Sequence, residues 1–537
     1  MVARENRRIG LSSRRQFMVA TAAAVMLAGT PRVQARKRGA TLRFVPHADL
    51  NILDPLWTTS YASRNHGYMI YDTLFAMDAN RRIRPQMVER YSVGNGQRHY
   101  SFVLRDGLRF HDGHPVTAED CVVSLRRWGK RDALGKLLLA ATDVIDVVDR
   151  KTFRLKLKEP FGLVLEALGK PSSNVPFVLP ARIAATSEND QIKEAIGSGP
   201  YKFIKDEWQP GYQVMYERCP DYVPRNEMPS GAAGGKRVYV DRVVWRYLAD
   251  PATAGAALET GEVDYWEYPP ADFAARLETN STLSVFVPDP YGAQGWLRPN
   301  HLHPPFNDAK ARQALAWMVD QEAFLRAAIG QPKYYRTCPG YFMCGSASYE
   351  SSIGALPKQD LGRARQLMKD SAYDGRPVVL LDPTDYPFLH AATLVTRELL
   401  SQIGVNVDLQ TMDWGTLTAR RAKKDPPLQG GWNLFNTAAT SSDVSTPAVN
   451  AGIDGTCDTA WFGWYCSKKM EKLRSEWVRT AENGVRKRLT EQIQDVAYDE
   501  VPYIPWGQIL QPCVSRRNVH GILEFPAPLL WNISLDT

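Results

Sequence analysis

Short segments with the alternating pattern of β-strands are separated along most of this chain by longer segments with the periodicity of α-helices. Apolar residues recur at every second position in Thr41–Val45 and again in Tyr100–Leu104. A helix is predicted over Pro251–Thr260, because Gly261 follows it and glycine is typical of the position just after a helix. Repeated alternation of this kind predicts α/β lobes in which helices cover largely central sheets.

Two further local predictions concern a helix and a loop. Thr117 is suited to be the N-cap of a helix, with Asp120 at the third helical position, and Cys121 is predicted to be buried within that helix. The segment Pro229–Lys236 is rich in glycine and alanine, which predicts a flexible surface loop.

The length of the chain and its charge limit the class of protein. A chain of 537 residues is too long for a single hydrophobic core, which indicates two large lobes or about three domains. The net charge is +8, but six arginines and one glutamate within residues 1–35 account for most of it. The remaining charge is small and spread along the chain, which argues against a nucleic-acid partner.

The N-terminal segment has the features of an export signal. Arg14 and Arg15 precede a short apolar run, Val19–Gly29, and small residues for cleavage lie near Ala35. We therefore expect residues 1–35 to be a signal peptide of the twin-arginine type that directs the protein to the periplasm, with the general secretory route as the alternative. No cysteine suited to a lipid anchor lies near the end of this signal, and no later run reaches the roughly 18 apolar residues that span a membrane.

The cysteines favour disulfides over a metal site. Cys338 and Cys344 enclose one short loop, and Cys457 and Cys466 enclose another, so both pairs are expected to close in an oxidising compartment. Their spacings match no common zinc pattern. The chain has seven cysteines, so at least one thiol is expected to stay free.

Motifs of common enzymes are missing from the sequence. It has no GxSxG nucleophile motif, no HExxH zinc motif, no phosphate-binding P-loop and no GxGxxG after a strand. His301 and His303 come nearest to a metal-binding pair, but Pro304 and Pro305 follow at once, so a solvated loop is the better interpretation. We expect neither catalysis, nor a cofactor, nor a bound metal.

Five sequence motifs occur in an order that resembles a known family. The chain is similar to the family 5 extracellular solute-binding proteins, the peptide- and nickel-binding group, from about residue 41 to 525. The segments that carry this resemblance are Tyr100–Cys121, Gly197–Ile204, Gly261–Tyr265, Pro305–Gln321 and Val501–Gly507.

The resemblance implies a two-lobed periplasmic binding protein fold of the class II-like, Venus-flytrap type, with an extra domain in the first lobe. The chain is expected to cross between the lobes near residues 296–300 and again near 501–503, which would form a hinge. The implied parts are domain I (residues 36–80, 197–296 and 503–537), domain II (81–196) and domain III (297–502).

The resemblance also implies a function. The chain is expected to be the periplasmic substrate-binding component of an ABC importer, a monomer that captures peptides or peptide-like solutes between its lobes. It would contact the membrane permease directly and deliver the solute to the permease and ATPase complex. Two alternatives remain, namely the same fold binding a glutathione-like thiol, an opine, an oligosaccharide or a metal chelate, and an exported enzyme.

The ligand-binding residues are inferred partly from related peptide binders, in which an aspartate that pairs with the peptide amine follows a tryptophan in a W-x-x-D-Y-x-D-P segment. In this sequence Trp432 is followed at a greater distance by Asp443, and the Asp-Pro pair is missing. Asp443 is the first candidate for the amine-binding residue and Asn436 the second. This departure leaves the non-peptide alternative open.

Four aromatic or basic residues complete the expected site. Trp414 and Trp432 are expected either to line the ligand cleft or to anchor the hydrophobic core. Arg298 lies near the expected hinge and Tyr341 within the small cysteine loop, and either side chain is a candidate to face the ligand.

Overall fold

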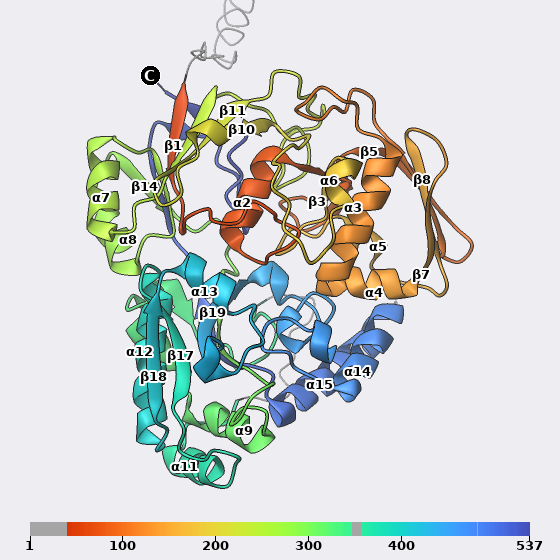
Figure 1. Cartoon of the computed structure of the whole chain (residues 1–537). Helices are drawn as coiled ribbons and strands as arrows, with labels where there is room; N and C mark the ends of the chain where they lie inside the picture. The colour runs from red at the N-terminus through yellow and green to blue at the C-terminus, as the bar shows by residue number, and fades with distance from the viewer. Residues whose placement is uncertain (1–39, 346–355, 481, 537) are drawn as a thin grey trace, which may run out of the picture. The chain divides into compact units, whose positions relative to one another are not determined.

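The computed structural model describes residues 40–345, 356–480 and 482–536. The expected export signal, including Arg14, Arg15 and the cleavage site near Ala35, lies outside these residues. Three larger sheets organise the described chain, and helices pack against them (Figure 1). The predicted α/β architecture is therefore confirmed.

The largest sheet joins the beginning of the described chain to its end. Its strand order is β10-β11-β12-β1-β13-β21-β14, in which β1 runs parallel to both its neighbours. Phe44 of β1 is fully buried, and its ring lies 5.7 Å from that of Trp245 and 5.2 Å from that of Tyr265. The strands are β1 (Thr41–Val45), β10 (Tyr201–Phe203), β11 (Gln213–Arg218), β12 (Arg242–Arg246), β13 (Tyr265–Glu267), β14 (Leu283–Phe286) and β21 (Cys513–Arg516).

A six-stranded sheet contains most of the strands from the second half of the chain. Its order is β16-β20-β15-β19-β17-β18, and β15 pairs antiparallel with both its neighbours. Every residue of β15, β17 and β20 is buried, which is typical of strands covered on both faces. The strands are β15 (Ala293–Pro299), β16 (Tyr335–Arg336), β17 (Val378–Pro383), β18 (Val407–Met412), β19 (Leu434–Thr440) and β20 (Ile504–Ile509).

A four-stranded antiparallel sheet of order β5-β6-β8-β7 forms from a continuous stretch of chain. It contains β5 (Val88–Gly94), β6 (His99–Leu104), β7 (Thr142–Val147) and β8 (Thr152–Leu157). Two-stranded pairs add β2 (Asp72–Thr73) with β9 (Phe177–Val178), β3 (Phe75–Met77) with β4 (Ile83–Pro85), and β22 (Val519–His520) with β23 (Ser534–Leu535).

The helices begin and end largely where local sequence signals place them. The N-cap Thr117 donates its backbone N–H to Asp120 Oδ2 at 2.7 Å, and Cys121 is fully buried in α3, as predicted. Helix α7 spans the predicted residues, and Gly261 ends it with a φ of 81°. The helices are α2 (Tyr61–Ile70), α3 (Ala118–Arg131), α4 (Ala133–Ala141), α5 (Val164–Leu168), α6 (Ala181–Ala184), α7 (Pro251–Thr260), α8 (Ala271–Leu277), α9 (Ala309–Met318), α10 (Gln321–Ala328), α11 (Leu361–Lys369), α12 (Pro387–Gln402), α13 (Trp414–Arg420), α14 (Lys468–Arg479) and α15 (Asn483–Glu500).

The chain passes twice between the seven-stranded and six-stranded sheets. It leaves β14 and enters β15 through residues 287–292, and it returns from β20 to β21 through residues 510–512. The positions expected from the motifs, 296–300 and 501–503, instead lie at the end of β15 and just before β20. The sequence motifs mark the strands themselves, whereas the passages lie where backbone pairing stops.

The two passages lie close together at Gly292. This residue has a φ of +64°, and a Cβ atom built on it would lie 1.9 Å from the carbonyl oxygen of Ile509, the last residue of β20. Only glycine fits such a close backbone approach without rearrangement.

Both expected disulfides are present. Cys338 and Cys344 are bonded with their Cα atoms 5.8 Å apart, and Cys457 is bonded to Cys466. The other three cysteines are buried free thiols at positions 121, 219 and 513. The pairing therefore follows the short spacings in the sequence.

The segment Pro229–Lys236 differs from its prediction as a flexible surface loop. Ala232 and Ala233 are each 2% exposed and belong to the main hydrophobic core. The buried ammonium of Lys236 lies 2.9 Å from the buried carboxylate of Asp72. The prediction was wrong because small residues also allow close packing, and composition alone does not distinguish the two cases.

None of the helices built from the described residues is long and apolar enough to cross a membrane. In the same part of the chain, no group of three or more histidine, cysteine, aspartate or glutamate side chains is placed to hold a metal ion. His301 and His303 lie in a loop, as predicted, but both are only partly exposed, and the His301 ring nitrogen Nε2 lies 3.1 Å from the carbonyl oxygen of Pro502.

Candidate functional site

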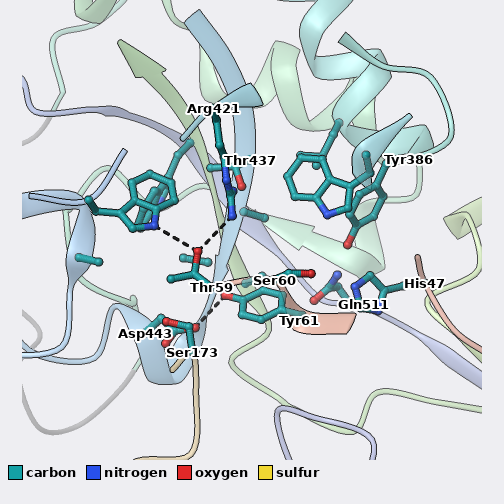
Figure 2. A pocket seen from close by; sticks show the side chains of 18 residues that line it. His47, Thr59, Ser60, Tyr61, Ser173, Tyr386, Arg421, Thr437, Asp443 and Gln511 are labelled. Atoms are coloured by element: carbon teal, nitrogen blue, oxygen red, sulfur yellow. Dashed lines mark hydrogen bonds between the residues drawn. The ribbon is translucent and has the colours of Figure 1, made fainter. Parts of the chain in front are cut away.

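A small cavity of about 50 Å³ lies between the segment that leads into α2 and the six-stranded sheet with its helices α12 and α13 (Figure 2). One wall comes from residues 47–61 and Ser173, and the other from β15, β19, the start of α12, both ends of α13, the segment after β19 and Gln511. The residues that line it are His47, Thr59, Ser60, Tyr61, Ser173, Ala293, Trp296, Tyr386, Leu389, Trp414, Arg421, Thr437, Ala438, Ala439, Asp443, Ala451, Trp461 and Gln511.

Two larger cavities adjoin the small one. A cavity of about 490 Å³ shares His47, Tyr386 and Gln511 with it, and another of about 560 Å³ shares Thr59, Ser173, Ala451 and Trp461. The three spaces therefore form a row, with the small cavity in the middle. Of these three cavities, the central one alone is lined by Asp443 and Arg421.

The Asp443 carboxylate is fixed on one side and unsatisfied on the other. It ends a 3₁₀ turn, Ser441–Asp443, directly after β19. Its Oδ2 atom accepts hydrogen bonds from the hydroxyls of Tyr61 at 2.7 Å, Ser172 at 2.9 Å and Thr440 at 2.8 Å. Its Oδ1 atom is buried and has no hydrogen-bond partner among the described residues. A buried oxygen of this kind favours a donor from a ligand.

Tyr61 positions this carboxylate from the opposite wall. Its hydroxyl accepts the backbone N–H of Thr440 at 2.7 Å and donates to Asp443. Burial, followed by the negative charge of Asp443, raises the pKa of Tyr61 well above its ordinary value, so the hydroxyl stays protonated and remains a donor.

Arg421 lies on the same cavity and follows the last residue of α13. Its side chain is buried, and burial lowers its pKa to about 9. Nη2 donates to the Thr59 hydroxyl at 3.0 Å, whereas Nε has no partner among the described residues. Aromatic rings surround the guanidinium, at distances of 5.6, 5.9, 5.3 and 5.0 Å from Trp414, Phe435, Trp461 and Phe462.

His47 is held at the junction of two cavities by a buried carboxylate. Its Nδ1 atom lies 2.7 Å from Glu267 Oε2, and both side chains are almost completely buried. Burial acts to raise the pKa of Glu267, but the charge and the hydrogen bonds of His47 outweigh it and lower that pKa. One ring nitrogen is therefore fixed by Glu267, which sets the orientation of the ring.

Two of the six expected ligand-binding residues line this cavity. They are Asp443 and Trp414, the latter packed edge-on against Tyr386 at 5.4 Å. Trp432 and Asn436 do not line it. The Trp432 indole donates to the Arg421 carbonyl oxygen at 3.1 Å from within the core, and the Asn436 amide donates to the hydroxyls of Thr393 at 3.2 Å and Thr396 at 3.0 Å.

Arg298 and Tyr341 are also fully buried away from the cavity. The Arg298 guanidinium donates to four backbone carbonyl oxygens, and the Tyr341 hydroxyl donates to the carbonyl oxygens of Ala497 at 2.9 Å and Tyr503 at 3.1 Å. These contacts fix backbone segments, so both side chains have structural partners in place of a ligand.

Sequence reasoning did not single out His47, Thr59, Tyr61 or Arg421. The first three belong to a segment without a recognisable motif, and their partners lie more than 200 residues away in the chain. For Arg421 the sequence held a weak indication of a role in the site, because this residue follows the helix that begins at Trp414, one of the expected cleft residues.

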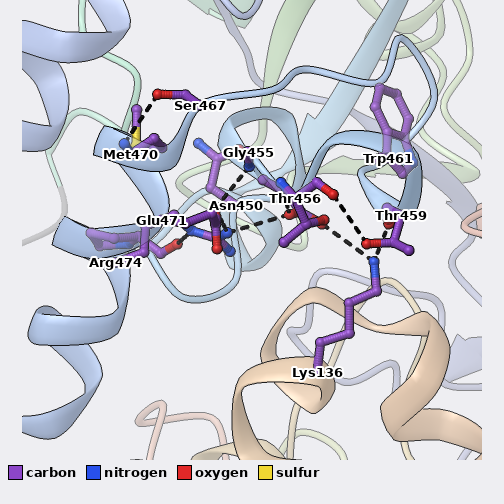
Figure 3. Close-up of polar contacts among 12 residues, drawn as sticks. Lys136, Asn450, Gly455, Thr456, Thr459, Trp461, Ser467, Met470, Glu471 and Arg474 are labelled. Carbon is purple, nitrogen blue, oxygen red and sulfur yellow. Dashed lines mark hydrogen bonds and ion pairs between the residues drawn. The ribbon is translucent and has the colours of Figure 1, made fainter. Parts of the chain in front are cut away.

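A charged cluster connects α4 with the loop that follows β19 (Figure 3). The Lys136 ammonium lies 3.5 Å from Asp454 Oδ2 and donates to the Thr459 carbonyl oxygen. On its other side, Asp454 lies 3.5 Å from the buried guanidinium of Arg474, which also pairs with Glu471 at 2.5 Å. Lys136, Asp454 and Thr459 line the larger cavity of about 560 Å³, so this cluster bridges the two sides of the row of cavities.

Comparisons with known proteins all identify relatives among the bacterial solute-binding proteins. The family model described as bacterial extracellular solute-binding proteins, family 5 Middle, matches residues 82–453. A probable peptide ABC transporter periplasmic-binding protein, y4tO of Sinorhizobium fredii, is 38% identical over 97% of this chain and 99% of its own length. The glutathione-binding protein GsiB of Salmonella typhimurium is 24% identical over 89% of this chain and 91% of its own length.

Solved structures show the same fold. The binding protein AgaA of A. tumefaciens R10, in complex with agropinic acid, has a TM-score of 0.78 and 21% identity, covering 93% of this chain and 99% of its own. DppA of Helicobacter pylori, in complex with the peptide STSA, has a TM-score of 0.77 and 20% identity over the same shares. The expected two-lobed periplasmic binding protein fold is thereby confirmed.

Proposed function

Since the chain belongs to family 5 of the bacterial extracellular solute-binding proteins, we propose that it captures a peptide or peptide-like solute for an ABC importer. In this proposal the solute binds in the row of cavities between the lobes, and the protein acts by binding, without catalysis. The loaded monomer then contacts the membrane permease directly and delivers the solute to the permease and ATPase complex.

The observation that carries the proposal is the half-satisfied carboxylate of Asp443. Three hydroxyls hold one oxygen, and the other faces no partner among the described residues. An ammonium group of a solute would satisfy it, because a buried carboxylate gains most from a charged donor. The two flanking cavities, of about 490 and 560 Å³, offer room for the rest of the solute.

A second candidate is a non-peptide amino-acid derivative. It is supported by the small size of the central cavity, about 50 Å³, by relatives named as glutathione-binding proteins, and by the similar structure of another protein, AgaA, which holds agropinic acid.

Mass spectrometry of solute that co-purifies with the native protein tests the proposal directly. We expect a small amine-bearing molecule that is released on denaturation. Added back at about 100 times its dissociation constant, it should stabilise the folded protein by about 2.7 kcal/mol through mass action, which a thermal denaturation scan detects. Turnover of the molecule into a product during the assay would instead identify an exported enzyme.

The lobes are proposed to move about the two passages at residues 287–292 and 510–512. The close approach of Gly292 to Ile509 supports this hinge, because it keeps the passages side by side. The contact of Lys136 with Asp454 and Thr459 would then form when the lobes close. The expected domains were I (residues 36–80, 197–296 and 503–537), II (81–196) and III (297–502). We propose the same three domains, but place the limit near 296 within residues 287–292 and the limit near 503 within residues 510–512.

Export to the periplasm through the twin-arginine route is proposed from Arg14 and Arg15. Replacing both arginines with lysine keeps the charge but removes the recognised pair, so we expect precursor to accumulate in the cytoplasm. Immunoblots of periplasmic and cytoplasmic fractions measure this, and the same exchange at Arg7 and Arg8 is the control. Undiminished export of the first variant would favour the general secretory route.

A further inference from the structure

Two buried arginines differ in how their charge is compensated. Arg298 is fully buried, and burial lowers its pKa to about 9. Its guanidinium donates to the carbonyl oxygens of Phe462 at 2.7 Å, Gly452 at 2.8 Å, Pro502 at 2.9 Å and Trp461 at 3.3 Å. The protein therefore supplies the acceptors that this buried cation requires.

Arg421 is 2% exposed but has far fewer acceptors. Its guanidinium donates to the Thr59 hydroxyl, its Nε atom has no partner, and no carboxylate within the described ranges forms an ion pair with it. The aromatic rings around it offer cation–π contacts but no hydrogen-bond acceptor. A guanidinium presents its donors in a fork that fits a carboxylate, so an anion is the partner that this site lacks.

Another residue on the same cavity, Asp443, lacks a hydrogen-bond donor where Arg421 lacks an acceptor. Both residues line a space of about 50 Å³. At about 10–15 Å³ for each water, this space holds only a few small groups. Figure 2 shows Thr59, which binds Arg421, next to Tyr61, which binds Asp443, along the same wall. The two charged side chains therefore line one small space.

We propose that Arg421 and Asp443 together bind one unblocked α-amino-acid head group, with its carboxylate on Arg421 and its ammonium on Asp443. This inference rests on the proposed function and specifies its solute class. Ammonium and carboxylate on a single carbon atom make up the small zwitterion that fits a cavity of this size. The remainder of the solute extends into one of the flanking cavities.

An ordinary α-linked peptide does not meet this requirement, because the carboxyl group of its first residue is part of an amide bond. A peptide linked through the γ-carboxyl of glutamate keeps both α-groups free, as does an amino acid conjugated through its side chain. The solute class is therefore amino-acid conjugates with a free α-carboxylate next to the amine.

Calorimetric titration of the wild-type protein with three probes tests the inference. The probes are γ-glutamyl-alanine, the same dipeptide with its glutamate α-carboxylate converted to a carboxamide, and the isomeric α-glutamyl-alanine. We expect γ-glutamyl-alanine to bind at least about 30-fold more tightly than the carboxamide, because the latter leaves the buried guanidinium without its anion. Equal affinities of these two probes would overturn the inference.

Variants assign the preference to Arg421. In Arg421→Gln the difference between the two γ-linked probes should disappear, while Arg421→Lys should retain part of it because the cation remains. Arg298→Lys is the matched control, since it alters an equally buried arginine whose acceptors are backbone carbonyls, and it should keep the full preference. A preference that survives in Arg421→Gln would also overturn the inference.

The outcomes separate the inference from the function it rests on. Tight binding of α-glutamyl-alanine together with no response to γ-glutamyl-alanine would overturn the head-group assignment and leave a peptide-binding function in place. If the native protein carries no co-purified solute and binds none of the three probes, both the head-group assignment and the proposed solute-binding function are contradicted.

Discussion

Asp443→Asn should weaken the binding of an amine-bearing solute by about 2–5 kcal/mol, because a desolvated ammonium group would lose its charged partner. The asparagine keeps the size of the side chain and can still accept hydrogen bonds from Tyr61, Ser172 and Thr440 through its carbonyl oxygen. The fold around the cavity is therefore expected to persist, and the effect on affinity reports the lost charge.

Calorimetric titration of wild type and variant with the co-purified solute and with its N-acetylated form measures this effect. Acetylation removes the positive charge, so the variant should bind the acetylated form about as weakly as the wild type does. Asp264→Asn is a suitable control, because Asp264 is another buried carboxylate but accepts from the Arg43 guanidinium and lines none of the three cavities. The same affinity in all four combinations would show that Asp443 holds no amine.

Lys236→Met is expected to destabilise the protein by about 3–5 kcal/mol, because it leaves a buried carboxylate without its cation. Asp72 is fully buried, and its remaining hydrogen bonds come from the Tyr222 hydroxyl at 3.0 Å and the backbone N–H of Thr73 at 2.9 Å. These neutral donors stabilise the charge less than an ammonium group at 2.9 Å does.

Urea denaturation monitored by circular dichroism measures this loss of stability as a lower urea concentration at the midpoint of unfolding. Adding Asp72→Asn to the variant should recover much of the stability, because the uncompensated charge is then gone. Lys333→Met is the matched control, since it breaks a solvent-exposed pair with Glu278 and should change the stability by less than about 1 kcal/mol. An unfolding curve for Lys236→Met that coincides with that of the wild type would contradict the prediction.

Local signals in the sequence were sufficient for many elements of the fold. Helix α7 follows from Pro251 at its start and Gly261 after its end, and α3 from the capping pair of Thr117 and Asp120. Both depend on hydrogen bonds and backbone angles within a few residues, which the sequence specifies directly. The segment 229–236 was misjudged because its burial depends on packing against distant parts of the chain.

The candidate site was harder to predict from the sequence, because it too depends on packing between distant parts of the chain. Trp414 and Trp432 carry the same side chain and belong to the same hydrophobic core, yet only Trp414 also lines the cavity. The direction in which a large aromatic side chain points depends on the tertiary fold. Arg421 and Thr59 are 362 residues apart in the sequence, so no local pattern connects them.

The strand order of the largest sheet has a consequence for biosynthesis. In that sheet β14 pairs with β21 alone, and β21 (Cys513–Arg516) is synthesised after every strand of the other two larger sheets. By contrast, the strands of the four-stranded sheet lie within residues 88–157, and those of the six-stranded sheet within 293–509. Domains generally form as units as the chain emerges from the ribosome, and pairing between distant segments is slow. Of the three larger sheets, the one whose first strand is made earliest is therefore the last to be completed.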